Sequence, residues 1–145
     1  MLYLGADHRG FKAKEKLKQW LFSKKIEYKD LGASKFDPQD DYPDIAQKLA
    51  KIVVKKKAKG VLICGSGAGV AIAANKIKGI RAAIGFNPQQ TRKMIEDDGV
   101  NILCLAADYI SKFKAFQLVK IFFKTQFKNK DQYLRRVKKI RMLER

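Results

Sequence analysis

The chain has 145 residues, of which 32 are Lys or Arg and 14 are Asp or Glu, so its formal net charge is +18 at pH 7. An apolar share of 46% and a charged share of 32% exclude a disordered or collagen-like sequence and favour one compact domain over residues 1–145. Two cysteines without a CxxC pair, together with one histidine, exclude a disulfide scaffold and argue against a structural zinc site.

Short apolar runs alternate with amphipathic stretches along the whole chain, which is typical of an α/β protein with a mostly parallel sheet. Aliphatic runs predict five strands, at Leu2–Ala6, Ile26–Leu31, Gly60–Cys64, Ile80–Gly85 and Asn101–Ala106. Helices are predicted between them. Apolar residues recur at helical spacing in the first two, namely at Phe11, Leu17, Trp20 and Leu21, and behind Pro43 at Ile45, Leu49, Ile52 and Val53.

Polar residues follow the first strand, where Asp7, His8 and Arg9 stand at its carboxyl end. Open α/β sheets bind ligands at this edge, so we expect His8 to face a ligand rather than the core. His8 or Arg9 can meet a phosphate there. The longest loop, Leu31–Tyr42, is also the most acidic one, and loops of this kind after a strand often border a site.

The third strand runs directly into a glycine-rich turn, Gly65-Ser66-Gly67-Ala68-Gly69, and then into a helix. Glycines let backbone N–H groups approach an anion, and the helix N-terminus adds positive potential, so the turn predicts an oxyanion site. A tight turn without a ligand is the alternative. No Gly-Lys-Ser/Thr follows and the dinucleotide spacing is absent, which excludes a P-loop and a dinucleotide fingerprint.

Cys64 ends the third strand beside these N–H donors, where a thiolate is stabilised and can act as a nucleophile or general base. The alternative is a buried small hydrophobic side chain. We adopt that alternative for Cys104, which lies in the interior of the last predicted strand. Position therefore separates the two cysteines.

After the last strand the chain continues as two helical segments, Ser111–Phe127 and Asp131–Leu143. The first carries a wider apolar surface than one sheet face needs. This surface is formed by Phe113, Phe116, Leu118, Val119, Ile121, Phe122, Phe123 and Phe127. We interpret it as a dimer interface, with an extended core as the alternative.

The positive charge raises nucleic acid or an anionic membrane as a partner, because a basic surface attracts phosphates. The excess is mostly lysine at helical spacing, and the sequence has no RNA-binding aromatic motif and no basic-region helix, which disfavours nucleic-acid binding. No apolar run approaches the roughly 20 residues that span a bilayer, and Met1–Gly10 is typical of a strand rather than a signal peptide. We expect a cytoplasmic protein without membrane attachment.

Seven stretches, in this order and spacing, resemble the family of ribose-5-phosphate isomerase B and galactose-6-phosphate isomerase over nearly the whole chain. They are Gly5–Phe11, Asp41–Pro43, Ile63–Gly69, Ala73–Lys76, Gly79–Ala82, Asn101–Leu103 and Arg136-Val137. The resemblance implies a flavodoxin-like sheet ordered 2-1-3-4-5 and a homodimer or homotetramer with shared sites, in which the final helix, about 131–143, reaches the partner. It also implies interconversion of aldose and ketose phosphates, such as ribose 5-phosphate and ribulose 5-phosphate, without metal or cofactor.

The same resemblance assigns roles to individual residues. Cys64 matches the proton-abstracting cysteine, while Val70 stands where a second branch of the family has a glutamate. Ser66 matches a hydroxyl that would hold the enediolate oxygen together with the N–H groups of Gly65, Gly67, Ala68 and Gly69. Substrate contacts are matched by Asp7, by His8 near the phosphate, and by Tyr42.

Four positions depart from the family pattern. Asp97 and Asp98 stand where the family has a His-Asn pair whose histidine opens the sugar ring, and Asp108 and Gln132 stand where it has arginines. Arg136 keeps the remaining arginine of the final helix. Because these positions belong to the active site in the family, the resemblance implies that Asp97 and Asp98 are site residues here. Asp97 is the candidate for opening the sugar ring.

Three hypotheses accommodate these departures. In the leading one the chain is a working isomerase, with Asp97 opening the ring and Arg9, Arg135 or nearby lysines balancing the phosphate. In the second it resembles the cysteine-bearing subunit of a heteromeric galactose-6-phosphate isomerase, which needs a paralogous partner. In the third it is a non-catalytic relative that binds a sugar phosphate or nucleic acid, against which the presence of Cys64 and Ser66 argues.

Overall fold

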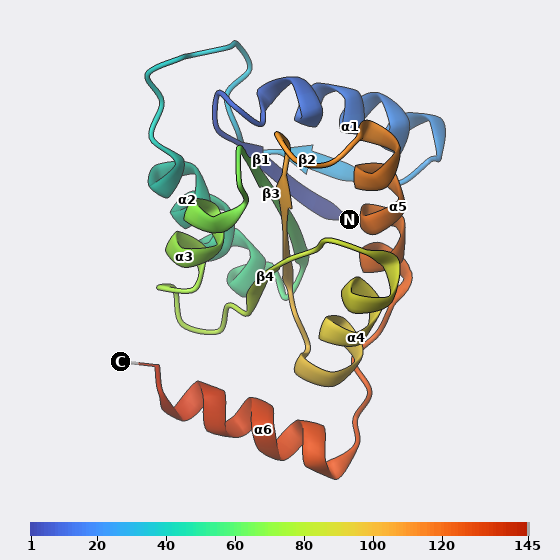
Figure 1. The fold of residues 1–145 in the computed structure, drawn as a ribbon. Coiled ribbons are helices and arrows are strands. Elements are labelled where there is room, and N and C mark those ends of the chain that lie inside the picture. Colours follow the sequence, from blue (N-terminus) through green and yellow to red (C-terminus); the bar gives the residue numbers. More distant parts are fainter. Residues whose placement is uncertain (145) are drawn as a thin grey trace.

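A five-stranded parallel sheet lies between two layers of helices in the computed structural model, which describes residues 1–144 (Figure 1). The strands are β1 (Leu2–Ala6), β2 (Tyr28–Asp30), β3 (Lys59–Cys64), β4 (Ala82–Ile84) and β5 (Ile102–Ala106). The helices are α1 (Phe11–Ser23), α2 (Tyr42–Lys56), α3 (Ala68–Ala74), α4 (Pro88–Asp98), α5 (Lys112–Lys124) and α6 (Asp131–Met142). The predicted α/β fold class is confirmed.

The strand order differs from the expected 2-1-3-4-5: the sheet is ordered β2-β1-β3-β5-β4. All five residues of β5 are buried, whereas the three residues of β4 are only half-buried. A strand that is apolar on both faces is most stable inside the sheet, and a short half-exposed strand fits its edge. β5 therefore pairs with β3, with Cys64 opposite Ala106, and β4 takes the edge.

Two strands are shorter than predicted because their flanking residues hydrogen-bond outside the ladder. The Ile26 N–H donates to the carbonyl oxygen of Leu21 in α1 at 3.0 Å, so the predicted start of β2 belongs to a turn. Before β4, the Arg81 N–H donates to the Asn101 side-chain oxygen at 2.8 Å. Local hydrophobicity predicted the strands, but hydrogen bonds to residues outside the sheet ladder set their ends.

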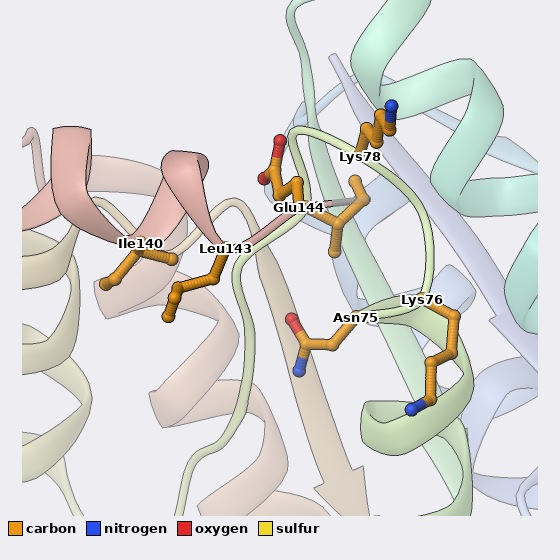
Figure 2. Close-up of a pocket in the computed structure, with 7 residues that line it drawn as sticks. Asn75, Lys76, Lys78, Ile140, Leu143 and Glu144 are labelled. Carbon is orange, nitrogen blue, oxygen red and sulfur yellow. The ribbon is translucent and has the colours of Figure 1, made fainter.

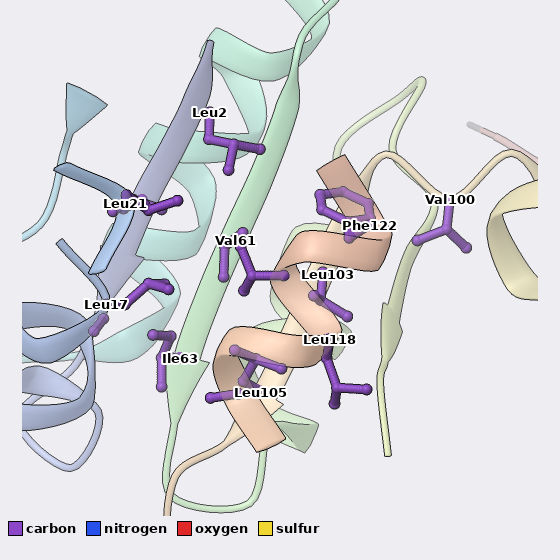
Figure 3. Packing of buried hydrophobic residues seen from close by; sticks show 14 of the residues in the cluster. Leu2, Leu17, Leu21, Val61, Ile63, Val100, Leu103, Leu105, Leu118 and Phe122 are labelled. Carbon is purple, nitrogen blue, oxygen red and sulfur yellow. The ribbon is translucent and has the colours of Figure 1, made fainter. Parts of the chain in front are cut away.

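Alternate residues of the central strands separate two cores. Val61 and Ile63 of β3 pack in one cluster with residues of α1 and α5, as Figure 3 shows, while Leu62 and Cys64 pack in the other with residues of α2 and α3. Each fully buried aliphatic side chain contributes about 1.5–3 kcal/mol of hydrophobic stabilisation. The alternation places the Cys64 thiol on the α2 and α3 side of the sheet.

The broad apolar surface of α5 belongs largely to the core of one chain. Leu118, Val119 and Phe122 are buried, and Phe116 stacks on Trp20 with ring centroids 5.2 Å apart. Phe113 remains exposed. The buried part of this surface therefore fits the alternative interpretation, an extended core under helix α5 (Figure 3), and the dimer interface stays a prediction for its exposed part.

Helix α6 lies apart from the two layers, beside the amino ends of the strands (Figure 1). Val137 is its buried residue, while Leu134, Ile140 and Met142 are exposed. The Gly79 N–H donates to Glu144 Oε1 at 2.9 Å, which ties the end of α6 to the turn before β4. Figure 2 shows the pocket between this turn and α6, lined by Asn75, Lys76, Lys78, Ile80, Ile140, Leu143 and Glu144.

A buried lysine anchors the acidic loop. Lys14 of α1 has no exposed surface, and its ammonium donates to Asp30, to Glu15 Oε1 at 2.9 Å and to the Ala33 carbonyl oxygen at 3.3 Å. Burial alone raises the pKa of Asp30, but hydrogen bonds from Lys14 and Lys18 bring it below its ordinary value. The Lys14 ammonium therefore holds the start of the loop that follows β2 against α1.

Candidate active site

Cys64 lies at the carboxyl end of β3 with 5% of its surface exposed. The turn behind it folds back on the thiol, and the Gly67 N–H donates to Cys64 Sγ at 3.2 Å. Gly67 has φ +76°, a left-handed conformation that side chains other than glycine rarely adopt. The turn can therefore present backbone N–H groups beside a shielded sulfur.

Ser66 projects from the same turn and is exposed. Its Oγ accepts a hydrogen bond from the Ala68 N–H at 3.3 Å, which fixes the hydroxyl at the open side of the turn. Gly65 and Gly67 are buried, whereas Ala68 is exposed and Gly69 half-buried. The predicted oxyanion loop is thus assembled within one chain around Cys64.

The end of β1 lies beside this loop because β1 pairs with β3, Ala6 standing opposite Ile63. Asp7 is buried, its N–H donates to the Ile63 carbonyl oxygen at 3.2 Å, and its Oδ1 accepts from the Gly10 N–H at 2.9 Å. A side chain at Gly10 would stand 2.3 Å from the Ile63 carbonyl oxygen. This close approach holds the Asp7-His8-Arg9 turn against the end of β3.

His8 is fixed by a carboxylate from the acidic loop. Asp40 Oδ1 lies 2.7 Å from His8 Nδ1 and also accepts a hydrogen bond from the His8 N–H at 3.0 Å. This double contact holds the ring in one orientation and leaves Nε2 free for a ligand. The sequence marked the acidic loop as a site border but not Asp40 itself, because its partner lies 32 residues away.

Tyr42 covers the loop from the start of α2. A side chain at Gly69 would approach the Tyr42 ring to 2.8 Å, so glycine is needed for the ring to lie on the turn. Tyr42, predicted to line the substrate pocket, thus lies against the glycine-rich turn; its contact with a substrate stays a prediction. The ring forms an apolar wall on the α2 and α3 side of the site.

The end of β5 lies at the same edge of the sheet and carries Asp108, which stands where the family has an arginine. The Ala107 N–H donates to the Cys64 carbonyl oxygen at 2.9 Å and the Asp108 N–H to the Gly65 carbonyl oxygen at 3.1 Å. The Asp108 carboxylate pairs with the Arg9 guanidinium. The position expected to carry a positive charge thus holds an ion pair, whose positive member comes from the β1 turn.

Asp97, Asp98 and Arg136 lie elsewhere in the same chain. Helix α4 runs back along the sheet, so its last residues reach the amino ends of the strands, where Arg81 Nε donates to the Asp98 carbonyl oxygen at 2.9 Å. Asp97 pairs with Lys93 of its own helix at 3.3 Å. Arg136 is exposed on α6, as is Gln132. One chain therefore does not bring these residues to Cys64.

Cys104 occupies the middle of β5 and is fully buried. Burial raises the pKa of its thiol, and the nearby Cys64 raises it further. A protonated thiol without access to solvent is a packing group, as predicted for this cysteine. Within residues 1–144, no group of three His, Cys, Asp or Glu side chains is arranged to hold a metal ion.

The sequence model of the family described as Ribose/Galactose Isomerase matches residues 2–140. The chain belongs to this family. A Mycoplasma genitalium protein named "Probable ribose-5-phosphate isomerase B" is 36% identical over 141 residues, which cover 96% of this chain and 92% of that protein. No helix within residues 1–144 of this family member is long and apolar enough to cross a bilayer.

Two solved structures of the family superpose closely on this chain. Ribose 5-phosphate isomerase from Thermotoga maritima has a TM-score of 0.92 at 36% identity, covering 98% of this chain and 97% of its own. Ribose-5-phosphate isomerase B from Mycoplasma genitalium, solved with bound ribulose-5-phosphate, has a TM-score of 0.91 at 34% identity, covering 97% and 93%. The resemblance stated from the sequence motifs is confirmed at the level of the family.

Proposed function

We propose that the chain is a sugar-phosphate isomerase that interconverts ribose 5-phosphate and ribulose 5-phosphate through an enediolate. The observation that carries this proposal is the shielded Cys64 thiol at the carboxyl end of β3, enclosed by a glycine-rich loop, in a member of a family whose relative binds ribulose-5-phosphate. A cytoplasmic location is part of this proposal, since sugar phosphates are metabolised in that compartment.

Cys64 acts as the general base in this proposal. The thiolate removes the proton from C2 of the open-chain aldose, and the electron pair of the C–H bond forms the C1–C2 double bond of the enediolate. Return of a proton to C1, with transfer of the hydroxyl proton from O2 to O1, gives the ketose. Reaction in either direction needs only proton transfers between adjacent atoms.

The glycine loop stabilises the charge that develops on oxygen. Ser66 and Ala68 are exposed in the turn beside the thiol, and the Ala68 N–H and the Ser66 hydroxyl can turn from each other to the substrate oxygen. Donors already close to the developing charge stabilise an oxyanion with little reorganisation. Asp7 and Tyr42 border the same space and contact the sugar. His8, oriented by Asp40, faces the phosphate end.

A second copy of the chain completes the site in this proposal. The carboxyl edge carries Cys64 and His8, while Asp97, Asp98 and Arg136 stand at the amino edge of the same sheet, so the two groups can meet only between copies. A homodimer that sets one edge against the other supplies Asp97 for ring opening and Arg136 for the phosphate. The exposed residues of α6 support such a contact.

The test is isomerisation of ribose 5-phosphate by the purified chain, with Cys64→Ala and Cys104→Ala as a matched pair. Loss of the general base reduces kcat by about 10³-fold, whereas Cys104→Ala retains kcat within a factor of about two because Cys104 is remote from solvent. Equal activity of the wild type and Cys64→Ala would show that Cys64 is not the base.

A second candidate function rests on the aspartates at positions 97 and 98. A chain that lacks the ring-opening histidine matches the cysteine-bearing subunit of a heteromeric galactose-6-phosphate isomerase. Under this alternative the purified chain is inactive on ribose 5-phosphate and gains activity on galactose 6-phosphate when a paralogous subunit is added. The same assay with both substrates separates the two functions.

A further inference from the structure

An ion pair between Arg9 and Asp108 bridges the end of β3. Arg9 follows β1 and Asp108 follows β5, and both strands pair with β3, so the two side chains meet above the strand that carries Cys64. A side chain at Gly65 would stand 2.6 Å from Arg9 Nε and 2.8 Å from Asp108 Oδ2. The pair therefore rests on the backbone of the residue next to the thiol.

The guanidinium of this pair remains accessible. The Arg9 side chain is 60% exposed and that of Asp108 is 34% exposed. Arg9 uses Nη2 for the carboxylate, and its planar fork has further N–H donors that match two oxygens of a phosphate. Among residues 1–144, Asp108 is the one carboxylate that pairs with Arg9.

The side of Arg9 away from Cys64 carries positive charge only. Lys12, Lys16 and Lys112 line the groove between α1 and α5 together with Arg9, and within residues 1–144 no carboxylate lines it. These lysines repel the guanidinium, and Asp108 attracts it toward the glycine loop. The Asp108 carboxylate therefore sets the position of the Arg9 guanidinium, and an anion of higher charge, such as a phosphate, can take the place of that carboxylate.

We propose that Arg9 binds the substrate phosphate in addition to His8 and to Arg136 of a second copy, and that Asp108 holds the Arg9 guanidinium over Gly65 until the phosphate displaces the carboxylate. This rests on the proposed function, whose sugar phosphate supplies the anion. Asp108 then acts as a competitor and positioning residue. A dianionic phosphate displaces it, whereas an uncharged sugar does not, so the pair makes binding selective for phosphorylated sugars.

A double-mutant cycle tests the exchange, with ribose 5-phosphate and inorganic phosphate as ligands and calorimetric titration as the readout. Arg9→Met keeps an unbranched apolar stem and removes the charged guanidinium, and it is expected to weaken binding of both ligands about 30-fold. Asp108→Asn removes the competitor and is expected to tighten binding about fivefold. In the Arg9→Met background, Asp108→Asn is expected to change nothing.

Lys12→Met is the matched control, because it removes the same charge from the same groove without touching Gly65; it is expected to change affinity by less than about twofold. The proposal is overturned if Arg9→Met binds like the wild type, or if Lys12→Met weakens binding as much. It is also overturned if Asp108→Asn tightens binding equally in both backgrounds, since Asp108 then repels the phosphate directly.

Binding needs no turnover, so this experiment separates the two proposals. A chain that binds ribose 5-phosphate through Arg9 but does not isomerise it overturns the proposed function alone. A chain that isomerises ribose 5-phosphate with unchanged binding in Arg9→Met overturns the exchange alone. Absence of phosphate and ribose 5-phosphate binding by the wild type overturns the exchange as well. Titration with ribose is expected to show no difference among the variants.

Discussion

The carboxyl and amino edges of the sheet carry candidate site residues in different states of organisation. At the carboxyl edge each residue is fixed by a partner within the chain: Cys64 by the Gly67 N–H, His8 by Asp40, and Arg9 by Asp108. At the amino edge Arg136 is exposed and Asp97 pairs only with Lys93 of its own helix. The candidate residues of one edge are held in place within the chain, and those of the other edge are exposed or bound only locally.

Mixing two inactive variants gives the largest effect that this comparison predicts. Cys64→Ala disables the carboxyl edge, and a variant with Asp97→Asn and Arg136→Ala disables the amino edge. Half of the dimers in an equal, randomised mixture contain one copy of each, and such a dimer has one intact site, so about a quarter of wild-type activity is expected.

The complementation is measured as kcat of the mixture after unfolding and refolding the two variants together. Each variant refolded alone is the control. A mixture no more active than its components would mean that one chain builds its whole site, which would break the division between the edges.

Lys14→Met tests whether the carboxyl edge depends on the buried anchor of the acidic loop. Methionine has a similar length but leaves Asp30 without its main partner in a partly buried place, which is expected to destabilise the fold by about 3 kcal/mol. Urea unfolding measures the change. Lys12→Met on the exposed face of the same helix is expected to stay within about 0.5 kcal/mol, and an equal loss in both would assign the effect to helix α1 in general.

Asp40→Asn and Asp40→Ala test whether the Asp40 carboxylate orients the His8 ring. Asparagine retains an oxygen that can accept from the His8 N–H and ring, so its KM for ribose 5-phosphate is expected to rise only about threefold, against about tenfold for alanine. kcat is expected to change less than KM in both, because His8 contacts the phosphate end. A fall in kcat with constant KM would place His8 in the proton transfers instead.

The smallest predicted effect is the pH dependence of the Asp30 anchor. The pKa of Asp30 is lower in the folded chain than its ordinary 3.8, so its contribution to stability is present above pH 3.8 and is lost as the pH falls below it. Asp30→Asn lacks this dependence. The free energy of unfolding of the wild type is expected to exceed that of Asp30→Asn at pH 5, and this difference is expected to become smaller at pH 3, by less than about 1 kcal/mol. A difference that is the same at both pH values would contradict the prediction.

Local patterns predicted the parts of the molecule that local physics decides. The buried third strand, the glycine turn and the different positions of Cys64 at a strand end and Cys104 inside a strand follow from hydrophobic runs and from glycine geometry at neighbouring positions. The exchange of β4 and β5 was not predicted, because both are short apolar runs and only packing in the whole sheet assigns the inner place.

The candidate site was predictable where its residues follow the strand ends and not where they pair across the chain. Asp108 was treated as a lost charge because its partner Arg9 is 99 residues away. Asp97 and Cys64 were grouped in one site, yet α4 runs opposite to the strands, so any residue at its end stands at the far edge. That consequence of the topology was available from the sequence alone.

The inner place of β5 also constrains the order in which the fold can assemble. β4 precedes β5 along the chain but pairs with β5 alone, so when β4 leaves the ribosome the only edge of the growing sheet on that side belongs to β3. β4 and α4 must wait for residues 102–106 before they can dock, and any earlier pairing of β4 with β3 must be undone. Because β4 cannot join the sheet before β5 is in place, productive folding depends on the last third of the chain.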